Sequence, residues 1–209
     1  MNQTQDFTKG VIWKQLLFFF FPILIGSFFQ QLYNTVDTII VGQAVGTSAL
    51  AAVGSTGNLT SLIVNFDVGL STGASVVIAQ YYGAQNEKKI HQAVHTSYIL
   101  AIVSGILMML FGLFFSYQCL DAIGTPHDIL NDATLYMQLY FLCMIPGAIY
   151  NIGAGILRAV GDSKRPLYYL IVCSIVNVVF DFIFVVIFHQ GIAGAAIATV
   201  IAQFVCAIL

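Results

Sequence analysis

Residues 16–42 read LLFFFFPILIGSFFQQLYNTVDTIIVG, and this stretch decides the class of fold. A helix of about 20 predominantly apolar residues is long enough to cross the hydrocarbon core of a bilayer. The run also contains a carboxylate, Asp37, which costs roughly 2.5–3.5 kcal/mol at the centre of a membrane helix. Such residues persist mainly where they line a cavity or bind ions and protons. The stretch therefore predicts a transmembrane helix with a functional acidic residue.

The whole chain has the composition of an integral membrane protein. Its 209 residues are 59% hydrophobic and 8% charged, with a mean hydropathy of +0.90, which excludes a soluble globular domain. The net charge of -2 and the lack of a basic patch argue against a nucleic-acid partner. Six stretches are apolar enough to span a bilayer, which predicts an all-α bundle of six transmembrane helices. They are residues 16–42, 57–82, 92–117, 132–157, 167–188 and 192–209.

The basic residues assign an orientation to these helices, because Lys and Arg near helix ends are retained on the cytoplasmic side. All seven precede the first predicted helix or lie in alternate connections, and the remaining connections carry none. The seven are Lys9, Lys14, Lys88, Lys89, Arg158, Lys164 and Arg165. We therefore expect both termini to be cytoplasmic. The last predicted helix reaches Leu209 without a polar flank, so we also expect the chain to be a fragment or a truncated product.

Cysteine and glycine residues are interpreted as packing residues. The cysteines fall singly in the sequence and are read as small hydrophobic residues. They are Cys119, Cys143, Cys173 and Cys206. The pairs Gly42–Gly46 and Gly69–Gly73 have the GxxxG spacing that lets membrane helices approach closely.

Polar residues gather on single faces of three predicted helices, at spacings of three and four residues. They are Gln30, Tyr33, Asn34 and Asp37 in the first helix, Ser174, Asn177 and Asp181 in the fifth, and Thr199, Gln203 and Cys206 in the sixth. The fourth helix presents a soft and aromatic face of Tyr140, Met144, Gly147 and Asn151, which suits amphipathic ligands of varied shape. At 1.5 Å per residue, Asp37, Asp181 and Thr199 lie on the order of 10 Å below the outer surface, and Asn177 lies one turn deeper. We therefore expect these four residues to meet in one cavity, with Asn151 nearer the cytoplasmic side.

A structural role competes with a functional one for these polar residues. Asn, Gln, Ser and Thr often form hydrogen bonds between membrane helices, each worth about 0.6 kcal/mol, without any transport function. Asn34, Ser174 and Gln203 fit that role taken singly, whereas an ionised carboxylate such as Asp37 or Asp181 is too costly for it. A third intramembrane carboxylate, Asp67, shares a face with Ser71 and Ser75, and its role stays open.

Four stretches resemble the multidrug and toxic compound extrusion (MATE) family of transporters. The first runs from Gln30 to Gly42 and contains Asp37. The others are residues 77–84, residues 151–166 with Arg158, Gly161, Asp162 and Pro166, and residues 177–181. They agree in order and spacing with the family pattern and together span the chain. The resemblance implies a twelve-helix antiporter made of two six-helix lobes, of which this chain is the N-terminal one.

The resemblance also implies site residues and partners. A proton or sodium site corresponds to Asp37, Asn151, Asn177, Asp181 and Thr199. Sodium would be held by Asp37, Asn177 and Asp181. A substrate cavity is expected at Gln30, Tyr33, Asn34, Tyr140, Met144 and Gln203. The expected partners are the bilayer of the cell membrane, small organic cations and amphipathic drugs, and a C-terminal lobe or second copy of the chain. No cofactor besides the coupling ion is expected, and Asp67 matches no family site residue.

The expected mechanism couples an ion to drug release. Asp37 and Asp181 would face each other in a pocket of low dielectric constant and share a proton, or the same oxygens would coordinate sodium. Binding would rearrange the first helix, which Pro22 and Gly26 make bendable. The alternatives are a flippase for lipid-linked precursors, which needs a basic cavity, and a non-transporting structural module. An intramembrane enzyme is not expected, because no catalytic motif is present.

Overall fold

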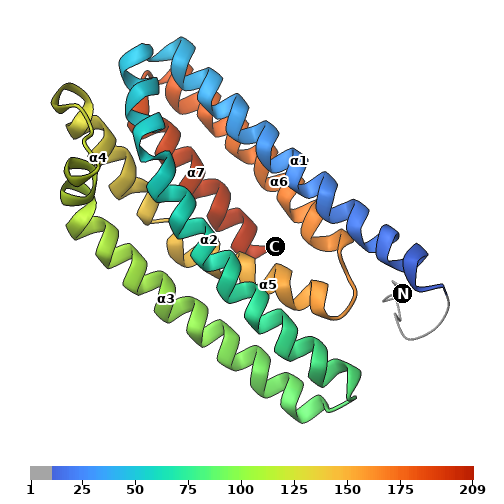
Figure 1. The fold of residues 1–209 in the computed structure, drawn as a ribbon. Helices are drawn as coiled ribbons and strands as arrows, with labels where there is room; N and C mark the ends of the chain where they lie inside the picture. The colour runs from blue at the N-terminus through green and yellow to red at the C-terminus, as the bar shows by residue number, and fades with distance from the viewer. Residues whose placement is uncertain (1–10) are drawn as a thin grey trace.

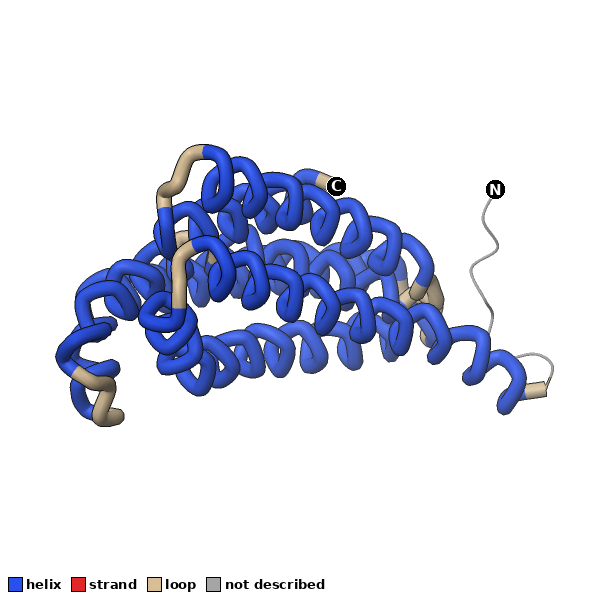
Figure 2. The backbone as a smooth tube through the Cα atoms, turned by 90° about the horizontal axis from the view of Figure 1, so that it is seen from above, coloured by secondary structure: helices blue, strands red, loops and turns tan. Residues whose placement is uncertain are grey.

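The computed structural model describes residues 11–209, so Lys9 lies outside the described residues. Within that part the chain is helical and contains no strand, as Figure 2 shows. The elements are α1 (Ile12–Ala44), α2 (Thr47–Gly83), α3 (Glu87–Ala122), α4 (His127–Phe141), α5 (Met144–Ala159), α6 (Lys164–Asp181), the π-helical segment η1 (Phe182–Ile187) and α7 (Gly191–Ile208). The all-helical prediction is therefore confirmed.

Five helices are long and apolar enough to cross a membrane, and α4 and α5 make a sixth span when the two are counted as one bent helix. These two helices meet at a bend of 48°, so residues 132–157 do not form the continuous helix expected from the sequence. The break lies just before Pro146, which has no N–H to donate to the preceding turn. The N–H groups of Leu142 and Cys143 instead bond three residues back, to Leu139 and Tyr140. Helix α2 begins ten residues earlier than predicted, because a helix extends beyond its most apolar segment.

The basic residues of the described chain lie near one end of the bundle. Lys14 is in the first turn of α1, Lys88 and Lys89 are in the first turn of α3, and Lys164 and Arg165 begin α6. In Figure 1 these helix ends lie together towards the lower right, opposite the α1–α2 and α3–α4 connections. The structure thus places on one side the charges that the sequence assigns to the cytoplasm.

The helices pack as two groups that leave a gap for a site. Helix α1 packs along α6, and α6 packs along α7, whereas α2 and α3 pack on α5. Helix α7 joins the groups through α4 and α5, but α5 and α6 make little direct contact. Figure 1 shows α1 and α6 side by side and separated from the α2–α3 hairpin. The space between the two groups is where the candidate site lies.

Close helix packing depends on glycines outside the two predicted pairs. A Cβ added to Gly112 would overlap the ring of Phe141, and one at Gly105 would lie 2.9 Å from the Ile145 Cα. Nothing lies within 4 Å of such an atom at Gly69 or Gly73, so the prediction of close approach there is wrong within the described chain. Gly46 has a different role, because its φ of 113° lies in the region that favours glycine.

Candidate functional site

The two carboxyl groups of Asp37 and Asp181 meet where α1 packs along α6. They lie within hydrogen-bonding reach of each other, and Asp181 is fully buried. Neither oxygen of Asp181 nor Oδ1 of Asp37 has a hydrogen-bond donor. Ionised carboxylates only accept hydrogen bonds, so two of them in contact need a shared proton or a bound cation. The pair is thus chemically suited to binding a positive ion.

Asn177 extends this group by one helical turn. Its side-chain Nδ2 donates to the Thr199 hydroxyl oxygen at 3.3 Å, and Thr199 donates in turn to the Ala195 carbonyl at 3.1 Å. The amide is therefore held with its oxygen unpaired, and that oxygen is also buried without a donor. Asn177 precedes Asp181 by four residues and shares its face of α6. The chain thus presents carboxylate and amide oxygens in succession, the ligand type that hard cations prefer.

The backbone changes its helical repeat immediately after Asp181. Helix α6 ends at this residue and continues as η1, whose wider turn is rare and frequently found at functional sites. Helix α7 packs tightly on this segment, because a Cβ at Gly194 would lie 3.1 Å from the Phe184 carbonyl carbon. The carboxylate therefore stands at a junction between two helical geometries.

A cavity of about 280 Å³ opens between the two helix groups. Asp37 and Asp181 do not line it, so the expectation that they share one cavity with Asn177 and Thr199 is wrong; the cavity begins one helical turn away from them, at Tyr33 and Asn177. The cavity is lined by five of the six residues predicted for substrate: Gln30, Tyr33, Tyr140, Met144 and Gln203. Asn177, Thr199 and Asn151 line it as well, and the Asn151 backbone carbonyl accepts a hydrogen bond from Ser71 at 2.5 Å. Asn34 does not line the cavity and is exposed, because it lies at the edge of the polar face of α1.

Two charged residues that the sequence did not assign to a site also line this cavity. Asp67 of α2 is 5% exposed, and its Oδ1 has no hydrogen-bond donor. Arg158 is half-buried at the end of α5, near Ser163 and Pro166. The sequence ended the fourth predicted helix at residue 157, whereas α5 continues through Arg158. Only a fold-level arrangement of α2, α5 and α6 reveals that these residues share one cavity.

Tyr136 of α4 is a further residue that sequence patterns missed. It is buried, interacts electrostatically with both Asp37 and Asp181, and stacks on Tyr140 with ring centroids 6.2 Å apart. Its spacing of four residues from Tyr140 was the available signal. Tyr136 therefore belongs to the surroundings of the carboxylate pair, whereas Tyr140 lines the cavity.

Two cysteines at the cavity wall are bonded to each other. Cys173 of α6 and Cys206 of α7 form a disulfide with Cα atoms 5.7 Å apart. The interpretation of these two as separate hydrophobic residues is therefore corrected. They lie 33 residues apart in the sequence, and only the antiparallel packing of α6 on α7 brings them together. Cys119 and Cys143 remain free thiols.

No group of three or more His, Cys, Asp or Glu residues that could hold a metal ion occurs in the part of the chain that the structure describes. A bundle of apolar spans with a buried carboxylate pair near an aromatic cavity is typical of membrane proteins that bind ions or protons within the bilayer. The family model MatE matches residues 22–183, more than half of the chain. The chain therefore belongs to the MATE family of multidrug efflux transporters.

Individual relatives agree with this assignment. The chain is 31% identical over 202 residues to the probable multidrug resistance protein YoeA of Bacillus subtilis, and covers 44% of that protein. It superposes on a MOP superfamily transporter from Pyrococcus furiosus with a TM-score of 0.91 and 28% identity, covering 99% of this chain and 46% of the other. A crystal structure of a MATE protein in the bent conformation superposes with a TM-score of 0.88 and 29% identity. The match covers 93% of this chain and 43% of the other. The chain thus spans less than half the length of these relatives and matches one lobe.

Proposed function

We propose that this chain is the N-terminal lobe of a cation-coupled antiporter that expels organic cations and amphipathic drugs. The observation that carries the proposal is the contact between Asp37 and Asp181, whose buried oxygens lack donors. An intramembrane carboxylate pair of this kind binds a proton or a cation or is strongly destabilising. The similarity to YoeA, a probable multidrug resistance protein, supports efflux as the direction of transport and drugs as the class of substrate.

The coupling ion is assigned to the carboxylate end of the site. Asp37 and Asp181 hold a proton between them, or bind sodium together with the oxygen of Asn177. Thr199 fixes the Asn177 amide through the hydrogen bond at 3.3 Å and thereby directs that oxygen away from itself. Asn151 lines the cavity from α5, which makes little direct contact with α6, so it joins the ligand set if α5 moves towards α6.

The substrate is assigned to the cavity. Tyr33 and Tyr140 offer aromatic faces, which attract organic cations by cation–π interaction. Met144 adds an adaptable apolar surface suited to ligands of varied shape. Asp67 supplies a buried negative charge without a partner in the same cavity, and so serves as the counter-charge for the substrate cation.

The ion-binding carboxylates and the substrate cavity are one helical turn apart on α1 and on α6. Tyr33 lines the cavity and precedes Asp37 by four residues on α1, as Asn177 precedes Asp181 on α6. A change in the charge of the carboxylate pair therefore acts directly on residues that contact substrate. Pro22 lies inside α1 and provides the point at which this helix bends.

Binding of tetraphenylphosphonium to the purified chain tests this assignment. We expect protons or sodium to compete with this cation, and Asp67→Asn to weaken its binding by about tenfold or more, as for a lost buried charge pair. Asp128→Asn, at an exposed position of α4, serves as the control. Equilibrium dialysis with the labelled cation measures both effects. Unchanged binding by the Asp67 variant would remove this residue from the substrate site, and binding unaffected by pH and sodium would contradict coupling.

The orientation of the lobe is tested separately by cysteine accessibility in intact cells. We expect single cysteines introduced near Lys88 and Lys164 to be protected from a membrane-impermeant maleimide, and those near Thr47 and Asp128 to react. The reason is the asymmetry of the seven basic residues. Labelling near Lys164 from outside would reverse the assignment of the termini.

A further inference from the structure

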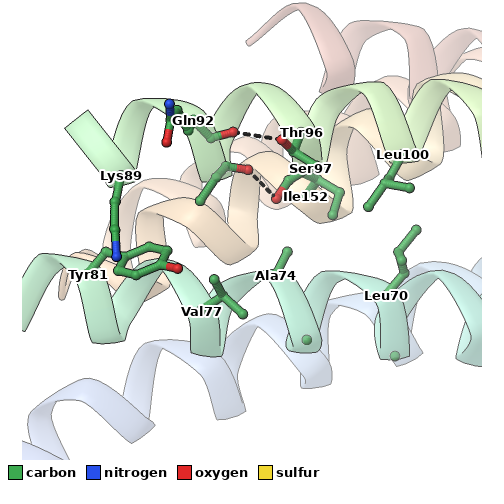
Figure 3. Close-up of a pocket in the computed structure, with 13 residues that line it drawn as sticks. Leu70, Ala74, Val77, Tyr81, Lys89, Gln92, Thr96, Ser97, Leu100 and Ile152 are labelled. Atoms are coloured by element: carbon green, nitrogen blue, oxygen red, sulfur yellow. Dashed lines mark hydrogen bonds between the residues drawn. The ribbon is translucent and has the colours of Figure 1, made fainter. Parts of the chain in front are cut away.

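A second cavity, of about 580 Å³, lies outside the transport site, between α2 and α3. Its walls are two helical stripes, one from Gly69 to Tyr81 on α2 and the other from Lys89 to Leu100 on α3, and Ile152 of α5 lies at its base. Figure 3 shows Lys89 and Leu100 of α3 pointing across this space towards Tyr81 and Leu70 of α2. We call this space the α2–α3 groove. None of its lining residues belongs to the ion or substrate site described above.

The groove is polar at one end and apolar along the rest of its length. Lys89, Gln92 and the hydroxyl of Tyr81 lie at the end that the basic residues assign to the cytoplasm, and the Lys89 ammonium lies 5.3 Å from the Tyr81 ring centroid. Further in, the hydroxyls of Thr96 and Ser97 donate to the carbonyls of Gln92 and Ala93 on their own helix. The hydrogen of each hydroxyl is therefore already donated within α3 and does not point into the groove.

The remaining walls are formed by aliphatic and small residues. Leu70, Val77 and Leu100 supply apolar side chains, and Val77 and Leu100 are exposed at 43% and 48%. Gly69 and Gly73 supply open space, because a Cβ at either position would meet nothing within 4 Å. Ile99 and Val103 of α3 are also exposed, so α3 presents an apolar surface along the same part of its length as the groove.

The length of the groove matches one leaflet of a membrane. From Lys89 to Leu100 the α3 backbone rises ~16 Å at 1.5 Å per residue. Half of the hydrocarbon core of a bilayer is about 15 Å thick. An occupant with its charged end at Lys89 and an apolar chain reaching Leu100 thus extends from the interface to the membrane midplane, as a phospholipid does.

The charge at the polar end selects an anionic occupant. Lys88 and Lys89 outweigh Glu87 in the first turn of α3, and the helix N-terminus itself favours negative charge. Anionic phospholipids are concentrated in the cytoplasmic leaflet, where basic residues near the surface attract them. We propose that the α2–α3 groove binds one anionic phospholipid, with its phosphate at Lys89 and one acyl chain between α2 and α3.

Native mass spectrometry of the purified chain, titrated with phosphatidylglycerol or phosphatidylcholine, tests the proposal. We expect phosphatidylglycerol to bind more tightly, and Lys89→Gln to weaken its binding about fivefold without changing that of phosphatidylcholine. Lys88→Gln is the matched control, because Lys88 lies outside the groove. Equal losses in the two variants would show diffuse electrostatic attraction and would overturn the site.

A second variant tests the acyl-chain part of the groove. Gly73→Leu places a side chain in open space within the groove and is expected to reduce binding of both lipids, whereas Gly54→Leu, at an exposed position of α2 outside it, is not. Circular dichroism and size exclusion check that both variants fold. Unchanged lipid binding by the Gly73 variant would contradict the proposal. A variant that loses self-association but keeps lipid binding would also contradict it, because the groove would then be a contact between protein chains.

Discussion

Asparagine in place of either member of the carboxylate pair, Asp37→Asn or Asp181→Asn, is expected to reduce ion-coupled drug efflux to background in a complete transporter that carries this lobe. The substitution keeps the size and shape of the side chain but removes the charge that binds a proton or sodium. It also supplies an amide donor to the remaining carboxylate, whose oxygens otherwise lack one. The variant therefore imitates the ion-bound state permanently and cannot cycle.

Efflux of a fluorescent organic cation from everted vesicles, driven by an imposed proton or sodium gradient, measures this effect. Asn34→Ala is the control on the same helix, because Asn34 is exposed and does not line the cavity. Thermal stability should be unchanged or raised in the Asp181 variant, since a fully buried carboxylate is replaced by a neutral group. Normal efflux by both aspartate variants at normal expression would disprove the coupling role of the pair.

The 209 residues expressed by themselves are expected to insert in a membrane and bind an organic cation but not to transport it. The carboxylate pair and the cavity are formed by helices within this lobe, so binding needs no further segment. Alternating access requires one repeat to rock against another around a central site, and the relatives are more than twice as long as the matched region.

A proteoliposome assay with the purified chain decides this point. Equilibrium binding of tetraphenylphosphonium should be measurable, whereas a proton or sodium gradient should produce no accumulation above that of empty vesicles. A matched preparation carrying Asp37→Asn distinguishes binding at the site from partition into lipid. Gradient-driven accumulation that disappears in this variant would contradict the expectation and would show that copies of the chain form a working dimer.

Much of this molecule followed from the sequence because the bilayer imposes a strong constraint. Backbone groups in hydrocarbon must be satisfied within their own segment, so a long apolar run has to be a helix. The cost of an intramembrane carboxylate singled out Asp37 and Asp181, and the 3.6-residue period placed Asn177 on the same face as Asp181. The structure brings these carboxyl groups into contact, although their role in coupling remains a proposal.

Other features depended on which helices become neighbours, which no local pattern encodes. Asp67 had no assigned role in the sequence, and it shares a cavity with Tyr33 and Asn177 only because α2 and α6 lie on opposite sides of the gap between the helix groups. Asn34 belongs to the polar stripe of α1 but lies at its edge, so the packing of α1 on α6 leaves it exposed. A periodicity defines a face of a helix, but the partner helix decides how much of that face is covered.

The sequence by itself determined that the chain is an all-helical bundle of apolar spans, and it singled out the carboxylates that are costly to bury in them. Tertiary structure alone decided the Cys173–Cys206 bond, the close approaches at Gly105 and Gly112, and the α2–α3 groove. The physical reason is that insertion energy is a property of each segment, whereas association of helices within a membrane depends on the shapes of two surfaces. Cys173 and Cys206, 33 positions apart, come together through this association, because α6 packs on α7.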